Sequence, residues 1–405
     1  MTTQPLEQSY LNDKVARRNA LILAIAMTLS SCSSIIVFST AGIVGTMLSP
    51  IPTLITLPIS AFVVGTALAT IPASLLMGKV GRKPGFMIGT GFAFCGGMLS
   101  TYALFEQSFV LFCFGTMLLG SYMAFTQYYR FAAADRATEN FKGKAISWVM
   151  IGGIGGAVFG TQIVSYSKSF FDPVLFAGAF LAAAVLALLA FALISLIDIP
   201  LVKVGEDKRK ARPMKEILKN PRLRVAVIAG MVSYGVMNLL MTATPIAMVA
   251  CGFSVDDSLG VIQWHVLAMY VPSFFTGHLI ARFGVERIIF AGLFMLVTAA
   301  VIGLMGITIV NFYAGLIMLG LGWNFGFIGA TTMVTQCYEP SEKSKVQAFN
   351  DFAVFGTVFV ASLSSGQLFA GIGWNAVNIA LFPMVAIAAV AMIWLSMHTK
   401  RQNAV

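Results

Sequence analysis

The sequence predicts an all-α integral membrane protein with about twelve transmembrane helices, arranged in two similar halves of six. Three observations predict this fold class. Of the 405 residues, 58% are hydrophobic and only 10% are charged, whereas soluble domains contain about 25% charged residues. The apolar residues form runs of about 20, the length that crosses a bilayer as a helix. A polar segment divides the runs six and six, and short motifs of the first half recur in the second.

The apolar runs fix the order of the expected helices. They cover residues 19–47, 53–77, 86–105, 109–131, 143–166, 173–197, 223–250, 258–281, 287–307, 310–335, 346–371 and 374–397. Several contain a proline, which a transmembrane helix tolerates where neighbouring helices or water satisfy its backbone. Residues 198–222 are predicted to be a cytoplasmic linker with at most a short amphipathic helix. The expected domains are therefore 1–197 and 223–405, each a six-helix bundle.

The Lys and Arg residues predict the orientation of the chain. With the N-terminus in the cytoplasm, only Lys168 falls in an outer loop, and the basic residues inside the runs, Arg130 among them, lie at the cytoplasmic ends of those runs. The positive-inside rule therefore predicts that both termini are cytoplasmic. The net charge of +10 comes from these loops. Because the basic residues lie between apolar segments, they do not form a nucleic-acid-binding surface. The five cysteines have no metal-binding or redox spacing, so we interpret them as packing residues.

Three pairs of segments match between the two halves. "GTMLLGSYMAF" (115–125) aligns with "GLIMLGLGWNF" (315–325), and "FKGKA" (141–145) stands where "EKSKV" (342–346) stands. The basic loop "SLLMGKVGRKPGF" (74–86) is repeated as "GHLIARFGVERI" (277–288). Gly81 and Gly284 in these loops are expected to let consecutive helices turn back tightly. Matches at nearly the same offset indicate a structural repeat, and many transporters bind their substrate where such repeats meet.

The basic loops resemble the Gly-x-x-x-Asp-Arg-x-Gly-Arg-Lys motif of the Major Facilitator Superfamily, which lies between its helices 2 and 3 and is echoed between helices 8 and 9. "AAADRATENFKGKA" (132–145) resembles the loop between helices 4 and 5 of that family. The resemblance implies a secondary transporter that works by alternating access, as a monomer, in the inner membrane of a bacterium. It also implies a small-molecule substrate and the lipid bilayer as partners, with no cofactor, no metal ion and no nucleic acid.

The family's acidic loop residue is missing, because Gly78 and Ala281 occupy its two positions. In the family this acid helps to hold a cytoplasmic gate closed against the start of helix 11. We hypothesise that Asp351, near the start of run 346–371, replaces it and faces Lys79 or Arg82. Alternatively, Asp351 complements the positive N-terminal end of its own helix. The residues expected to act in gating or coupling are Lys79, Arg82, Arg130, Asp135, His265, Arg282 and Asp351.

Ionisable residues inside a membrane are costly and usually functional. Arg130 is either an anchor at a helix end or a cation in the cavity, where it binds an anionic group or pairs with Asp135 or Asp351. His265 either couples transport to protons or is a neutral histidine hydrogen-bonded between helices. No carboxylate lies mid-span in the first, fourth, seventh or tenth run, which line the cavity in the family. This leaves facilitated transport, or coupling through Asp351, His265 or another gate residue.

An aromatic, amide-rich cavity follows from the depth of residues within the runs, at about 1.5 Å per residue. The residues expected to bind substrate are Ser34, Phe38, Tyr122, Gln162, Tyr234, Asn238, Gln263, Trp323 and Asn324. Tyr122 is placed at a depth equivalent to that of Trp323 and Asn324 by the repeat. A cavity without fixed charge suits a planar, neutral molecule that forms hydrogen bonds.

Two segments resemble the branch of the family that includes bacterial riboflavin importers: "IQWHVLAMYVPSFFTGHLIARFG" (262–284) and "NDFAVFGTVFVASLSSG" (350–366). This implies riboflavin or a related flavin as substrate, with another small organic solute as the next expectation. Proton-coupled drug efflux is an alternative, because the glycines of 143–163 resemble a signature of drug exporters. Ala157 and Thr161 break that signature, so close helix packing is the preferred interpretation.

Two further classes of protein are disfavoured by the sequence. The chain has no Gly-x-x-x-x-Gly-Lys-Ser/Thr loop, so ATP-driven transport is not expected. A membrane enzyme would need clustered His, Asp or Glu side chains. The three histidines, His265, His278 and His398, are dispersed instead, so an enzyme is a remote alternative.

Overall fold

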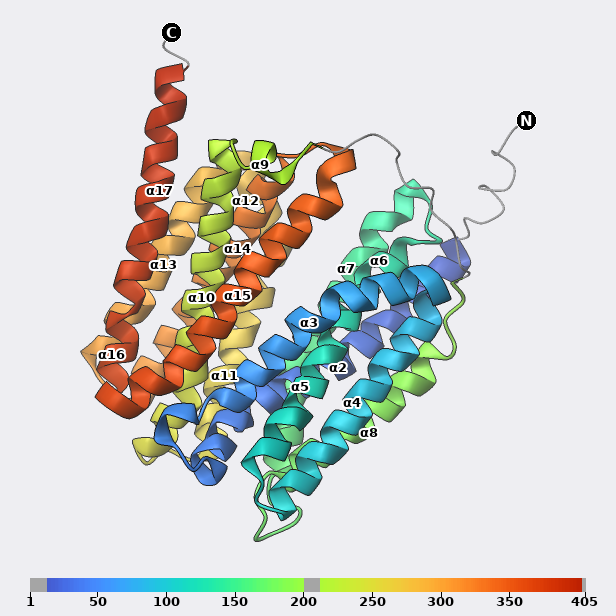
Figure 1. The fold of residues 1–405 in the computed structure, drawn as a ribbon, viewed down its shortest axis with the longest axis vertical. Coiled ribbons are helices and arrows are strands. Elements are labelled where there is room, and N and C mark those ends of the chain that lie inside the picture. The colour runs from blue at the N-terminus through green and yellow to red at the C-terminus, as the bar shows by residue number, and fades with distance from the viewer. Residues whose placement is uncertain (1–12, 200–211, 403–405) are drawn as a thin grey trace. The chain divides into compact units, whose positions relative to one another are not determined.

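The computed structural model describes residues 13–199 and 212–402. Over these residues the chain consists of helices joined by short loops (Figure 1). Contacts divide it into two compact units, Met1–Pro50 with Ala61–Val204, and Ile51–Ser60 with Gly205–Val405. No β-strand occurs in the described part of the chain, which confirms the predicted all-α class.

The first unit contains the helices of the N-terminal half. These are α2 (Asp13–Leu48), α3 (Leu57–Val80), α4 (Arg82–Phe105), α5 (Phe109–Thr126), α6 (Tyr129–Ala134), α7 (Glu139–Ser167) and α8 (Ala177–Ile194). Helix α2 packs along α7, and α4 packs between α5 and α8. The short 3₁₀ helix η1 (Pro52–Leu54) and the first turn of α3 belong to the second unit, where Ser60 Oγ lies 2.9 Å from Ser362 Oγ.

The second unit contains the remaining helices. These are α9 (Met214–Ile217), α10 (Pro221–Ala250), α11 (Val255–Tyr270), α12 (Ser273–Phe283), α13 (Val285–Met305), α14 (Ile309–Thr335), the 3₁₀ helix η2 (Pro340–Glu342), α15 (Lys343–Ile372), α16 (Trp374–Ile379) and α17 (Leu381–Gln402). Helix α10 is packed against both α14 and α15. Residues 200–211 of the predicted linker lie outside the described residues, and α9 is the short helix at its C-terminal end.

Within residues 13–199 and 212–402, eleven helical stretches are long and apolar enough to cross a membrane, and α11 with α12 supplies one more as a bent pair. This total of up to twelve confirms the predicted number. The expected span 258–281 is divided at Val271 and Pro272, where the chain bends by 42°. Proline removes a backbone donor and obstructs the preceding turn. Pro272 explains the break, although the apolar run continues through this residue.

The two basic loops form single-residue turns. Gly81 separates α3 from α4 with φ 96°, and Gly284 separates α12 from α13 with φ 88°. Only glycine adopts such angles without a steric penalty from Cβ. The structure confirms that these glycines let consecutive helices reverse tightly, at equivalent points of the two halves.

Glycines also set the distance between neighbouring helices. A Cβ added to Gly120 would lie 1.9 Å from the Phe62 carbonyl of α3, and one added to Gly320 would lie 2.6 Å from the His265 carbonyl of α11. The two aligned glycines therefore allow the same close contact between helices in the two halves. Along α7, glycines 152, 156 and 160 face α2, and an added Cβ would come within 2.5, 2.2 and 3.0 Å of it. This supports helix packing as the role of the α7 glycines.

Candidate functional site

Five aromatic rings gather where four helices of the second unit meet. Tyr234 of α10 has ring centroids 5.5 Å from Trp323 and 5.1 Å from Phe327, both on α14. Phe355 of α15 lies 6.2 Å from Tyr234, and Tyr270 at the end of α11 lies 6.3 Å from Trp323. Four of the five rings are only half-buried, whereas Trp323 is 7% exposed. We call these residues the aromatic cluster; its uncovered faces can stack on a planar molecule.

The break between α11 and α12 is held by Asn324 of α14. The Asn324 Nδ2 donates to the Met269 carbonyl at 2.6 Å and to Ser273 Oγ at 2.7 Å. Its Oδ1 accepts from Thr276 Oγ1 at 2.6 Å. Asn324 is fully buried, and its amide is occupied by protein groups. Asn324, a predicted substrate contact, therefore also has a structural role, because its amide stabilises the broken helix beside Tyr270.

Several buried polar atoms on α10 and α14 have no hydrogen-bond partner within the described residues. On α10 they are Ser233 Oγ, Asn238 Oδ1 and Thr242 Oγ1, and on α14 the atom is Trp323 Nε1. Asn238 is 2% exposed. Leaving a buried donor or acceptor unpaired costs about 1–3 kcal/mol. Unpaired atoms therefore indicate groups that a bound molecule or water would satisfy.

The predicted substrate-binding residues of the first unit contact other protein groups. Ser34 donates to the Ser30 carbonyl at 3.3 Å, and Phe38 packs edge-on to Phe62 at 5.3 Å. Tyr122 is buried, with its hydroxyl 3.4 Å from that of Tyr129. Their predicted contacts with substrate remain predictions.

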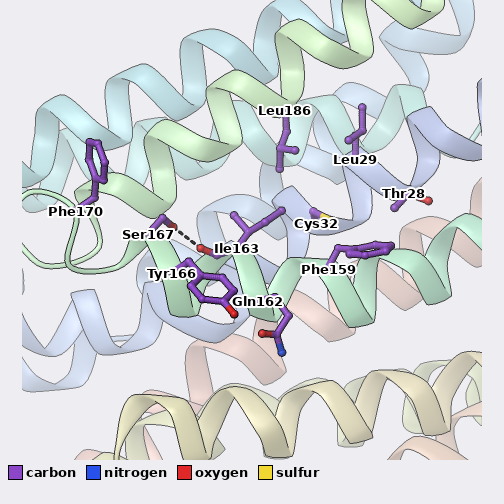
Figure 2. Close-up of a pocket in the computed structure, with 10 residues that line it drawn as sticks. All are labelled: Thr28, Leu29, Cys32, Phe159, Gln162, Ile163, Tyr166, Ser167, Phe170 and Leu186. Carbon is purple, nitrogen blue, oxygen red and sulfur yellow. Dashed lines mark hydrogen bonds between the residues drawn. The ribbon is translucent and has the colours of Figure 1, made fainter.

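Gln162 lines a groove of about 520 Å³ between α2, α7 and α8 (Figure 2). The lining also includes Phe159, Tyr166 and Phe170, whose side chains are largely exposed. Ser167 donates its hydroxyl to the Ile163 carbonyl at 2.5 Å, so that polar group is occupied (Figure 2). The groove is mainly apolar and offers few polar groups to orient a ligand. Gln263, the other predicted glutamine, lies half-buried on α11.

His265 is fully buried between α11 and α14. Its Nδ1 lies 2.7 Å from the Leu316 carbonyl, a distance at which a neutral ring donates from Nδ1. Its Nε2 has no partner in the described part of the chain. The geometry fits the interpretation of an interhelical hydrogen bond, and a coupling role for His265 stays a prediction.

The predicted gating residues are partly paired within their own units. Arg82, at the start of α4, forms a salt bridge with Asp135, and its second nitrogen lies 3.3 Å from Asp135 Oδ1. Arg130 lies over the ring of Phe131 at 4.8 Å, and Arg282 lies over Phe283 at 5.4 Å. Asp135 thereby supplies a carboxylate to the basic loop that lacks its own acid.

Lys79 and Asp351 are exposed. Asp351 Oδ1 accepts a hydrogen bond from Asn350 Nδ2 at 3.3 Å. The proposed pairing of Asp351 with Lys79 or Arg82 remains a hypothesis.

A buried carboxylate anchors the described end of the linker. Arg212 donates hydrogen bonds to both carboxylate oxygens of Glu342, with its Nε 2.5 Å from Oε1 and a terminal nitrogen 3.0 Å from Oε2. The backbone N–H of Glu339 also donates to Glu342. The side chain of Glu342 is 1% exposed. The hydrogen bond from Arg212 is the main reason why the pKa of Glu342 falls from 4.5 to about 2.

Three members of the aromatic cluster were not expected from the sequence: Tyr270, Phe327 and Phe355. Phe327 follows Trp323 by four residues, which places the two on one face of a helix, and this spacing was an available signal. Tyr270 directly precedes the Val271–Pro272 break. Phe355 carries no comparable local signal, because only the packing of α15 on α10 brings it near.

Comparisons with known proteins agree with this architecture. The sequence model of the Major Facilitator Superfamily matches residues 21–271 and 261–404. Riboflavin transporter RfnT of Brucella anthropi is 47% identical over 382 residues, covering 93% of this chain and 96% of that protein. The uncharacterized MFS-type transporter YddS of Bacillus subtilis is 24% identical over 84% of this chain and 81% of its own length. The crystal structure of nucleoside transporter NupG matches with a TM-score of 0.70 at 14% identity, over 94% of this chain and 99% of that one.

Proposed function

The chain belongs to the Major Facilitator Superfamily, and we propose that this transporter takes up riboflavin into a bacterial cell. It is a multi-pass membrane protein. The proposed location is the inner membrane, with both termini in the cytoplasm and the monomer as the working unit. The observation that carries the proposal is the 47% identity to a riboflavin transporter over 93% of the chain.

The aromatic cluster gives this proposal a physical basis. Riboflavin has a flat, neutral, three-ring isoalloxazine system, which presents two π-faces and an edge of hydrogen-bonding atoms. The rings of Tyr234, Trp323, Phe327, Phe355 and Tyr270 offer stacking surfaces, and Asn238 and Trp323 offer unpaired polar atoms. Stacking and a few well-placed hydrogen bonds are the usual means by which a pocket selects such a ligand.

The broken span beside the cluster suits an alternating-access transporter. Discontinuous helices in transporters place backbone groups at the substrate site and give it a point of bending. Here α11 ends at Tyr270, a member of the aromatic cluster. Asn324, which directly follows Trp323 in α14, stabilises the break through its hydrogen bond to the Met269 carbonyl. We propose that bending at Val271 and Pro272 changes access to the cluster during transport.

Drug efflux is less well supported. The α7 glycines that resemble an exporter signature lie against α2 as packing residues. Exporters of lipophilic cations commonly attract them with a buried acid. In residues 13–199 and 212–402, the only carboxylate beyond the first turn of a predicted span is the exposed Asp351 of α15.

Growth rescue tests the proposal. A bacterial strain that cannot make riboflavin and lacks its own importer is transformed with this chain and grown on low external riboflavin. Rescue is expected from the wild-type chain and is expected to be lost in Trp323→Ala. The matched control is Trp394→Ala, because Trp394 lies on α17, outside the aromatic cluster, with its ring 5.3 Å from that of His398. Verified membrane expression without rescue by the wild-type chain would overturn riboflavin uptake.

A further inference from the structure

Building on the riboflavin uptake proposed above, we infer that Asn238 and Trp323 read the imide edge of the isoalloxazine ring. That edge carries an N–H at position 3 between two carbonyl oxygens. It thus presents the sequence acceptor, donor, acceptor. A protein site that recognises it must offer at least one acceptor for the N–H and one donor for a carbonyl.

Asn238 and Trp323 offer this combination among buried side chains. Asn238 Oδ1 is an acceptor and Trp323 Nε1–H is a donor, and neither has a hydrogen-bond partner within the described ranges. The two side chains are 2% and 7% exposed. A carboxamide also carries an N–H₂ donor beside its oxygen, so that one Asn can form two parallel hydrogen bonds with an imide.

The packing of α10 on α14 places these two residues at the same level. Ser233 of α10 packs against Gly326 of α14, because a Cβ added to Gly326 would lie 2.3 Å from the Ser233 hydroxyl oxygen. Tyr234 contacts both Trp323 and Phe327. Because α10 and α14 are the seventh and tenth spans and therefore run in opposite directions, one turn from Tyr234 to Asn238 on α10 corresponds to one turn from Phe327 toward Trp323 on α14.

The same side chains can therefore act on two parts of the ligand. Tyr234, Trp323 and Phe327 cover ring faces, while the edge of Trp323 and the amide of Asn238 meet polar atoms at one end of the ring. The ribityl chain is attached to N10 of the central ring, away from the imide N–H. Recognition of the imide edge therefore predicts selectivity for flavins in general, with little dependence on the ribityl chain.

The distinguishing ligand is 3-methylriboflavin, in which a methyl group replaces the hydrogen of the imide N–H. Its inhibition of radiolabelled riboflavin uptake is measured in cells that express the full chain. Wild type is expected to bind 3-methylriboflavin roughly 5- to 100-fold more weakly than riboflavin, the range expected when a buried hydrogen-bonding group is left unpaired. Lumiflavin, which keeps the imide but lacks the ribityl chain, is expected to inhibit nearly as well as riboflavin. Equal inhibition by riboflavin and 3-methylriboflavin in wild type would overturn the inference.

The Asn238→Ala variant separates lost hydrogen bonding from simple crowding by the methyl group. If Asn238 binds the imide, riboflavin itself must bind more weakly to this variant, and the ratio between the two ligands must fall toward one. If the methyl group only collides with Asn238, riboflavin binding stays unchanged while 3-methylriboflavin improves, which would overturn the inference. A wild-type ratio retained in Asn238→Ala would also overturn it. The matched control is Thr244→Val, because Thr244 on α10 donates to the Leu240 carbonyl of its own helix.

Trp323→Phe keeps an aromatic ring but removes the Nε1–H donor together with part of the indole surface. It is expected to weaken riboflavin and 3-methylriboflavin to the same extent, since both retain the carbonyl oxygens. Trp374→Phe is the control, because the Trp374 Nε1–H already donates to the Gly303 carbonyl at 3.0 Å. Binding unchanged in Trp323→Phe would remove Trp323 from the site. Failure of wild type to transport riboflavin at all would instead refute the proposed function. This outcome is distinct from every outcome of the comparison between riboflavin and 3-methylriboflavin.

Discussion

The rings of Tyr234 and Trp323 lie 5.5 Å apart and join two helices that are distant in the sequence. Both residues belong to the second unit, and three further rings extend the surface that they begin. This surface stands beside the break between α11 and α12, so that one region combines aromatic stacking, unpaired polar atoms and a bend in a membrane span.

The ring of Tyr234 is expected to matter more than its hydroxyl group. Tyr234→Phe preserves the contacts with Trp323 and Phe327 and should change the KM for riboflavin uptake by less than about threefold. Tyr234→Leu removes a central aromatic contact and should weaken uptake by at least about tenfold, as for a residue that anchors a ligand. The KM is measured from initial rates of radiolabelled uptake, normalised to the amount of protein in the membrane. Equal effects of the two substitutions would argue against stacking.

Asn324 is expected to stabilise the broken helix and not to select the substrate. Asn324→Leu leaves the Met269 carbonyl and the Ser273 and Thr276 hydroxyls without its amide, at about 1–3 kcal/mol for each buried group that stays unpaired. The melting temperature of the purified protein should therefore fall. Asn238→Ala is the comparison, because the Asn238 oxygen has no hydrogen-bond partner to lose among the described residues, and the melting temperature of this variant without ligand should stay close to wild type. A stable Asn324→Leu protein would refute the structural role.

Gly81 and Gly284 are expected to be intolerant of a side chain. Their φ and ψ angles lie in a region that is occupied almost only by glycine, and a residue with Cβ is strained there by about 1–3 kcal/mol, so Gly81→Ala and Gly284→Ala should each lower thermal stability. Controls for the same change are Gly78→Ala in α3 and Gly277→Ala in α12. Both control glycines are helical and have no atom within 4 Å of an added Cβ. Alanine there should be neutral or stabilising by up to about 1 kcal/mol.

The bond between Arg212 and Glu342 is expected to stabilise the second unit in a pH-dependent way. The pKa of Glu342 is lowered to about 2 from 4.5, so the folded state favours the ionised carboxylate. This stabilisation is fully present above the unfolded pKa and is lost as the pH falls through the folded pKa. Glu342→Gln should therefore lower the melting temperature near neutral pH. Its deficit relative to wild type should shrink between about pH 4.5 and about pH 2. A deficit that stays constant over this interval would contradict the assignment.

Riboflavin uptake is expected to proceed without an imposed proton gradient. Within the described ranges, no carboxylate lies in the middle of a span, and His265 is held by the Leu316 carbonyl. Proteoliposomes loaded without a pH gradient should therefore accumulate riboflavin until the internal and external concentrations are equal. Concentrative uptake that requires an inward proton gradient would contradict this. Asp351→Asn and His265→Gln would then identify which group carries the coupling.

Much of the fold could be predicted because membrane helices obey few and strong constraints. Run length predicted the spans, and the aligned segments predicted a structural repeat between the two halves. Gly120 and Gly320 occupy equivalent contacts in the structure. Residues Ile51–Ser60 were not expected in the second unit, because no local pattern records that Ser60 meets Ser362.

The site was harder to predict, because helix depth locates a residue along the membrane and says little about which way its side chain points. Tyr234, Asn238 and Trp323 were named by depth, and Tyr234 and Trp323 prove to be in contact. Tyr122 was named by the same argument and is buried, with its hydroxyl 3.4 Å from that of Tyr129, so its contact with substrate stays a prediction. Asn324 was named as a ligand contact, whereas its amide is used by the helix break. The two adjacent residues Trp323 and Asn324 point to different faces of α14, which depth alone cannot distinguish.

Quenching of flavin fluorescence measures most directly whether the aromatic cluster binds the ligand. Purified full-length protein is titrated into riboflavin, with Trp323→Ala and Trp394→Ala prepared in parallel. An aromatic ring stacked on isoalloxazine should quench its emission, so saturable quenching is expected with wild type and Trp394→Ala and should be lost with Trp323→Ala. Saturable quenching of equal depth and affinity in all three proteins would show that riboflavin binds away from the cluster and would contradict the account.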